Sequence, residues 1–209
     1  MKKLILYFPL LFVFILFSCG EKKTDATTSS TSDASKNTGV VQQFSLDTKS
    51  STLKWKGSQT VDHFHTGTLA FKSGSVESNG VSFTGEFLID MSSMTITDEK
   101  MSKGEIEILK ETLMDVEFFN SSKFPEVSVK VDEFKEGKLK STINVLGKPV
   151  KRDIPVKMTN DGNKMLISGV FNLDFKELNL EGFKENKENP DETIKSVIEY
   201  ELNLVLLKK

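Results

Sequence analysis

Leu113–Pro125 reads LMDVEFFNSSKFP, and this stretch decides how the rest of the chain is organised. It is too irregular for a strand and too apolar for an ordinary surface loop. Phe118, Phe119 and Phe124 lie within seven positions, and aromatic side chains outside a regular element normally close over a core, because each ring buries a large apolar area. Pro125 fixes its own φ and pushes Phe124 into an extended conformation. The stretch therefore predicts the end of a helix, an aromatic plug, and a strand entering a sheet.

Alternating polar and apolar residues predict strands on both sides of this plug. Val81–Asp90 alternates with Val81, Phe83, Gly85, Phe87 and Ile89 on one face. Such alternation gives a sheet one apolar and one solvated face, which is typical of antiparallel sheets. The other strands are expected at Thr52–Ser58, Thr66–Lys72, Glu126–Phe134, Lys138–Leu146, Pro149–Met158, Lys164–Leu173 and Thr193–Leu207.

A single helix is predicted at Lys103–Asp115, immediately before the plug. Ser102 and Glu105 have the spacing of a capping box at its start. Its apolar positions follow the spacing i, i+3, i+7 of one helix face, at Ile106, Leu109 and Leu113. We expect this helix to lie across one mouth of a barrel, with Phe118 and Phe119 pointing inward.

About eight antiparallel strands in one chain favour an all-β fold, a closed up-and-down barrel. Closure removes the sheet edges that would otherwise pair with other chains. A barrel of this size is either filled with side chains or holds one small ligand. Small residues expected to face inward, Gly85, Ser141 and Gly169, alternate with large ones and would leave room in the interior.

The first 39 residues are predicted to be a lipoprotein leader and a tether. Residues 1–18 have two lysines followed by an apolar segment too short to span a membrane, as in a signal peptide. Cys19, the only cysteine, follows at once in a context that resembles the bacterial lipobox, which predicts lipidation and attachment to a membrane of the bacterial cell envelope. Residues 19–39 are polar and are expected to be a flexible tether. The barrel would occupy residues 40–209.

Three segments together resemble the YceI-like, polyisoprenoid-binding family. They are Gly85–Thr97, the plug Asp115–Pro125 with the valines after it, and Leu139–Val156. The resemblance covers roughly residues 48–207 and implies a lipocalin-like barrel whose apolar tunnel binds an isoprenoid-type lipid, without catalysis and without a cofactor. The expected ligand-binding residues are the apolar side chains on inward faces: Trp55, Phe83, Phe87, Phe118, Phe119, Val129, Ile143 and Phe171.

The two histidines are the remaining candidates for chemistry. His63 and His65 would point to one side of an extended segment, but two ligands do not make a zinc site, so no metal site is predicted. His65 resembles a family histidine near the barrel mouth and is the candidate contact for a lipid head group. A metal-dependent enzyme using both histidines, and a structural or adhesive lipoprotein with a filled barrel, remain the alternatives.

Two further features bear on partners. No basic cluster occurs in a chain of net charge −2, which argues against nucleic acid. Phe175–Glu192 is long and charged with embedded apolar residues, so it is either a lid or a solvated hairpin extension.

Overall fold

The computed structural model describes residues 39–59 and 62–209. The chain divides into two units, Met1–Lys36 and Asn37–Lys209, and the barrel forms within the second. The predicted signal peptide, Cys19 and most of the predicted tether lie outside the described residues. Among the described residues no helix combines the length and the apolar character that a membrane crossing requires.

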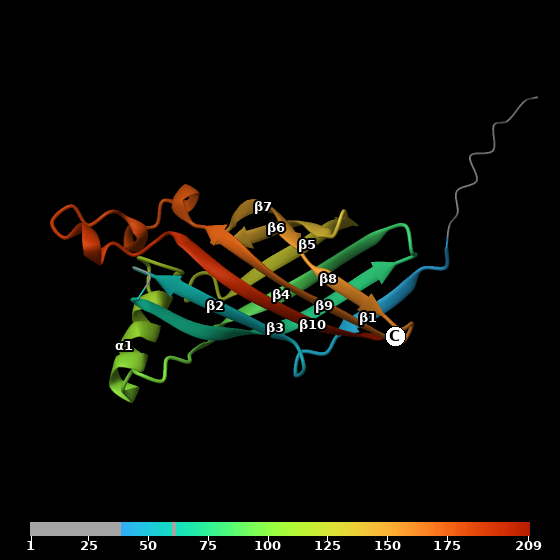
Figure 1. The fold of residues 1–209 in the computed structure, drawn as a ribbon, viewed down its shortest axis with the longest axis horizontal. Coiled ribbons are helices and arrows are strands. Elements are labelled where there is room, and N and C mark those ends of the chain that lie inside the picture. The colour runs from blue at the N-terminus through green and yellow to red at the C-terminus, as the bar shows by residue number, and fades with distance from the viewer. Residues whose placement is uncertain (1–38, 60–61) are drawn as a thin grey trace, which may run out of the picture. The chain divides into compact units, whose positions relative to one another are not determined.

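One antiparallel sheet of ten strands forms the domain (Figure 1). The strands are β1 (Gln42–Leu46), β2 (Thr52–Ser58), β3 (Phe64–Ser78), β4 (Phe83–Ile96), β5 (Glu126–Lys135), β6 (Lys138–Val145), β7 (Lys148–Pro155), β8 (Lys157–Asn160), β9 (Lys164–Asp174) and β10 (Val197–Lys208). The helix α1 (Lys103–Met114) and three short 3-10 turns, η1 (Lys176–Leu178), η2 (Glu181–Phe183) and η3 (Pro190–Glu192), complete it.

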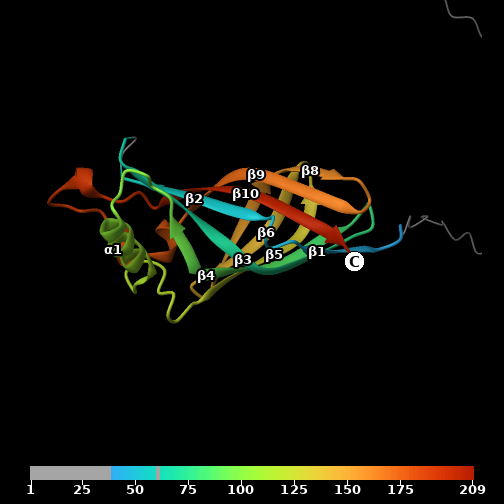
Figure 2. The same ribbon diagram turned by 90° about the horizontal axis from the view of Figure 1, so that it is seen from below.

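These ten segments follow eight strand paths around a barrel (Figure 2). β1 and β2 both lie between β3 and β10 and form one path, interrupted by residues 47–51. There the Asp47 amide donates to the Val205 carbonyl at 2.8 Å, and the Val205 amide donates to Ser51 Oγ at 2.9 Å. The interruption therefore leaves these backbone groups of β10 hydrogen-bonded. The arrangement of the strands confirms the predicted all-β, antiparallel barrel.

The eighth path is interrupted differently. β7 pairs with β6, β8 pairs with β9, and the chain changes partner at Val156. At this point a Cβ added to Gly169 would lie 2.4 Å from the Pro155 carbonyl oxygen, so β9 can approach the end of β7 only because residue 169 is glycine. Along the rest of β7 no ladder joins it to β9 in the described residues. We call this unpaired boundary the β7–β9 seam.

Several strands differ from the sequence expectation at their ends: the one expected at Pro149–Met158 is divided into β7 and β8, the last begins at Val197, and β3 and β4 show the physical reasons most clearly. β3 runs past Lys72, where the strand was expected to end, because Gly74 lies against the Phe87 ring, where an added Cβ would be 2.5 Å from Cδ1. Glycine here permits a close approach inside a strand. The placement of Val81 on the inward face is wrong: it is 77% exposed, and its amide donates to Asn79 Oδ1 in a turn that delays β4 until Phe83.

The helix and plug lie at one end of the barrel and cover part of it. The predicted capping box is present, since Ser102 Oγ accepts from the Glu105 amide and a Glu105 carboxylate oxygen accepts from the Ser102 amide. α1 also packs against the core with partly buried residues on the predicted face. The plug is buried as expected, with Phe118 3% and Phe119 6% exposed.

Candidate functional site: a cavity inside the barrel

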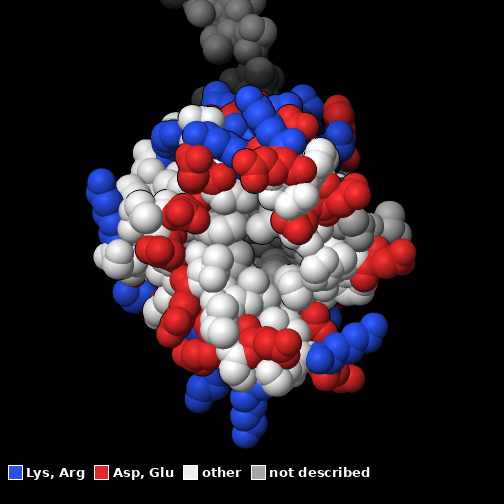
Figure 3. Space-filling model, turned by 90° about the vertical axis from the view of Figure 1, so that its left-hand side faces the viewer, with Lys and Arg blue, Asp and Glu red and all other residues white. Residues whose placement is uncertain are grey.

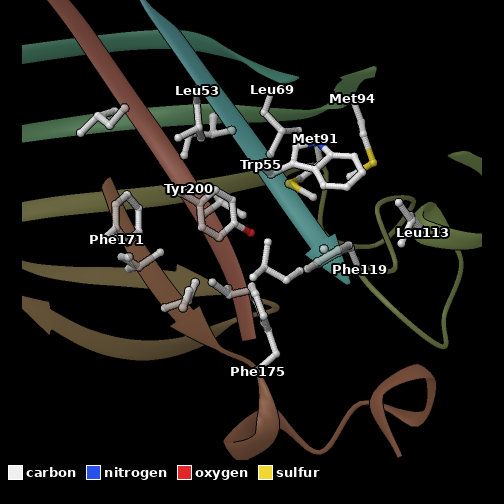
Figure 4. Close-up of a pocket in the computed structure, with 18 of the residues that line it drawn as sticks. Leu53, Trp55, Leu69, Met91, Met94, Leu113, Phe119, Phe171, Phe175 and Tyr200 are labelled. Carbon is white, nitrogen blue, oxygen red and sulfur yellow. The ribbon is translucent and has the colours of Figure 1, made fainter. Parts of the chain in front are cut away.

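The barrel is hollow. A cavity of about 340 Å³ lies inside it, lined almost entirely by apolar side chains from nearly every strand, from α1 and from the plug. This volume is within the range of roughly 300–1,000 Å³ that is usual for small-molecule sites. It is also more than twice the ~150 Å³ of an engineered apolar cavity that stays dry and binds benzene. Figure 4 shows the aromatic and sulfur-containing side chains around the space.

Most of the residues expected on the tunnel wall do line this cavity. Six apolar candidates lie on it, namely Trp55, Phe87, Phe119, Val129, Ile143 and Phe171, and so does His65 at its entrance. The strand residues reach the interior because alternation along a strand turns their side chains inward, whereas Phe119 reaches it from the plug. Contact of any of them with a lipid stays a prediction.

Two candidates lie elsewhere in the core. Phe83 packs edge-on against Phe134, with ring centroids 6.1 Å apart, and is not part of the cavity wall. Phe118 turns toward the loop after β9: its ring is edge-on to Phe183 at 5.3 Å and occupies the space that a Cβ on Gly182 would need. The expectation that Phe118 points into the barrel is therefore wrong, because the glycine in the loop offers its ring a closer fit.

The sequence interpretation missed several lining residues. Among them are Leu53, Leu69, Met91, Met94, Phe175 and Tyr200. Tyr200 is in register opposite Trp55, so alternation along the last strand could have identified it. Met91 and Met94 follow the stretch of strict alternation in β4, where only the fold shows that the strand continues.

The small residues expected to leave space contribute unequally. Ser141 is 4% exposed and lines the cavity. Gly85 does not, because a Cβ there would lie 3.0 Å from both the Ser75 carbonyl oxygen and a Val76 methyl group. The hollow therefore depends on how far the walls are apart as well as on small side chains.

The loop after β9 covers part of the entrance, which supports the lid interpretation over a solvated hairpin. Phe175 is 2% exposed and edge-on to Phe119 at 5.4 Å. Phe183 stacks on Phe175 at 5.8 Å, and the Gly182 amide donates to the Glu117 carbonyl of the plug at 2.9 Å. Plug and loop thus form a continuous aromatic wall at the mouth.

The histidines stand at the mouth with a carboxylate. His65 Nδ1 lies 3.2 Å from Asp98 Oδ2, and the ring of His63 is edge-on to that of His65 at 5.5 Å. Hydrogen bonds from the Lys100 amide and then from His65 lower the pKa of the Asp98 carboxyl below its usual value. Among the described residues no three His, Cys, Asp or Glu side chains lie close enough together to hold a metal ion.

The mouth is predominantly acidic. Residues 97–117 and 175–196, which surround it, contain thirteen Asp and Glu but only seven Lys. In Figure 3, which looks at this end, acidic side chains surround a hollow. The rim would attract cations and repel anions, while the cavity beneath it is apolar.

Comparison with known proteins gives the following. The family model of the YceI-like domain matches residues 44–206. A polyisoprenoid binding domain from Saccharophagus degradans, implicated in plant cell wall breakdown, is 15% identical with a TM-score of 0.59, covering 79% of this chain and 98% of that one. BcnA from Burkholderia cenocepacia is 17% identical with a TM-score of 0.62, covering 77% of this chain and 98% of that one. No curated protein matches the sequence. At these identities the two structures support the fold alone.

Proposed function

Because the chain belongs to the YceI-like domain family, we propose that it binds an isoprenoid-type lipid inside the barrel, as a carrier or for sequestration and without catalysis. The observation that carries this proposal is the enclosed apolar cavity of about 340 Å³ with its entrance between α1, the plug and the loop after β9. A branched hydrocarbon chain is the kind of ligand that such a wall accommodates. The relative from Saccharophagus degradans is itself described as a polyisoprenoid binding domain.

Burial of the hydrocarbon chain is sufficient to account for binding. Each buried CH2 contributes about 0.8 kcal/mol, so ten would contribute about 8 kcal/mol, of the order of micromolar affinity before ordering costs. Because the wall is apolar, selection among lipids would depend on length and width more than on hydrogen bonds.

The two alternatives are less well supported. A purely structural barrel would be expected to have a filled interior, and this one is hollow. A metal-dependent enzyme using His63 and His65 would need a third ligand. The nearby carboxylate is that of Asp98, which contacts His65. Two histidines and a carboxylate that do not converge on one point offer a weak basis for metal chemistry.

A native mass spectrum of the protein purified from its own cells tests the proposal. We expect the mass of the protein plus one lipid, released on collisional activation as an isoprenoid species. A bound metal ion in place of the lipid would favour the enzyme. A bare protein mass, together with failure to take up added geranylgeraniol, would contradict lipid binding.

Lipid attachment at Cys19 forms a separate part of the proposal. The cysteine follows the apolar leader directly, as expected of a lipoprotein of the bacterial envelope. We expect Cys19→Ala to move the protein from the membrane to the soluble fraction, because the substitution removes the thiol that would carry the lipid. Since a single acyl chain holds only marginally, we expect more than one chain at this cysteine. Fractionation in high salt with immunoblotting measures this, and Ser18→Ala is the matched control. A Cys19→Ala variant that stays with the membrane would contradict the anchor.

A further inference from the structure

The hydroxyl of Tyr200 faces the apolar cavity without a hydrogen-bond partner among the described residues; Trp55 Nε1, on another lining residue, also lacks a partner but is itself fully buried in the wall. The residue is 9% exposed and lines the cavity, and its hydroxyl makes no hydrogen bond to any described residue. Figure 4 shows it pointing away from Phe171, on which the Tyr200 ring stacks at 5.4 Å, and into the enclosed space. Buried hydroxyls normally have a partner, so this one indicates a hydrogen-bonding group on what fills the space.

The position of Tyr200 places that group just inside the mouth. Tyr200 is three residues from Val197, where β10 begins beside the loop that covers the entrance, which is about 10 Å along the strand. Deeper in the barrel, the Ser141 hydroxyl lines the cavity but already lies 3.4 Å from the Leu139 carbonyl oxygen. A lipid that enters with its tail first would therefore leave its polar end level with Tyr200.

The surroundings of Tyr200 favour an uncharged polar end. Burial raises the pKa of its phenol, so the hydroxyl stays protonated and offers a neutral donor. The one lysine that lines the cavity, Lys195, is exposed at the mouth, and the rim above it is acidic. A phosphate drawn down to the level of Tyr200 would lose its hydration and gain no buried cation in return.

We propose that Tyr200 is the specificity-determining residue of the cavity, donating a hydrogen bond to an uncharged oxygen, such as an alcohol or carbonyl, at the polar end of the bound isoprenoid. This inference rests on the proposed function, since it concerns the head group of the same ligand. It selects neutral isoprenoids over isoprenyl phosphates.

Three probes with one hydrocarbon chain test this: geranylgeraniol, the hydrocarbon with hydrogen in place of its hydroxyl, and geranylgeranyl monophosphate. Binding to the purified full-length chain can be followed by the emission of Trp55, the only tryptophan, which lines the cavity. We expect Tyr200→Phe to lower the affinity for the alcohol by roughly 3- to 10-fold, which corresponds to the loss of one neutral hydrogen bond. The affinity for the hydrocarbon should change by less than about 2-fold. Thr142→Val is the matched control, because it removes a hydroxyl from the outer face of β6, away from the cavity, and we expect it to leave the affinity for the alcohol unchanged.

Each other outcome has a distinct meaning. If Tyr200→Phe lowers the affinity for the alcohol and for the hydrocarbon equally, or lowers neither, the role assigned to Tyr200 is overturned while lipid binding itself stands. A phosphate that binds wild type more tightly than the alcohol would overturn the preference for a neutral head group. If none of the three probes binds, confirmed by native mass spectrometry, the proposed function fails and this inference fails with it.

Discussion

Phe119→Ala is expected to lower the free energy of unfolding by about 3 kcal/mol, toward the lower end of the roughly 3–5 kcal/mol usual for a buried phenylalanine. The ring is 6% exposed and packs edge-on against Phe175, so its removal separates the plug from the loop after β9. The loss should not reach the upper end, because part of the ring already borders a cavity and makes fewer contacts there.

Urea denaturation of the full chain measures this change. Val116→Ala is the matched control, since Val116 belongs to the same stretch and is 65% exposed, and we expect it to cost within about 0.5 kcal/mol. A loss below 1 kcal/mol in Phe119→Ala would mean that the plug does not hold the mouth together.

Ser141→Trp is expected to abolish retention of lipid and to leave the fold intact. Ser141 lies on β6 with its side chain on the cavity wall, so an added indole can extend into empty space and occupy the place of the ligand. In a filled core the same change would cost roughly 1–3 kcal/mol through overpacking. For a chain of this length that cost corresponds to a fall in Tm of about 2–12 °C.

Two measurements on the same sample, the melting temperature and the retained lipid, separate these outcomes. Asn144→Trp places the same side chain on the exposed outer face of β6 and should change neither. A large fall in Tm with lipid still retained by the folded fraction of Ser141→Trp would show that the ligand lies elsewhere.

Much of the fold could be predicted because local patterns and tertiary structure agree. Thr52–Ser58 was predicted with the bounds that the structure shows, since its alternation ends at turn residues. The helix was predicted to begin at Lys103, as observed, because a capping box is a purely local signal. These features need no information from distant parts of the chain.

The departures occur where a distant contact decides the structure. Gly74 looks like a turn residue in sequence, but in the barrel it makes room for the Phe87 ring and the strand continues. In sequence, Gly169 is a small residue that would leave space on an inward face. In the barrel, its lack of a side chain allows the end of β7 to approach β9 closely. Phe118 and Phe119 are adjacent aromatics with the same local signal, and only the position of Gly182 decides which one turns away from the cavity.

The β7–β9 seam bears on how long a lipid the barrel can hold. Strands elsewhere in the wall part only by breaking ladder hydrogen bonds, whereas β7 and β9 share none in the described residues. At one end a side chain of β7 reaches past this boundary instead: Lys148 Nζ donates to the carbonyl of Leu178, in η1 just after β9, at 3.2 Å. Such a contact can yield without breaking the ladder of the sheet. The seam is therefore the boundary of the described wall that would separate with the smallest loss of backbone hydrogen bonds if the bound chain were longer than the cavity.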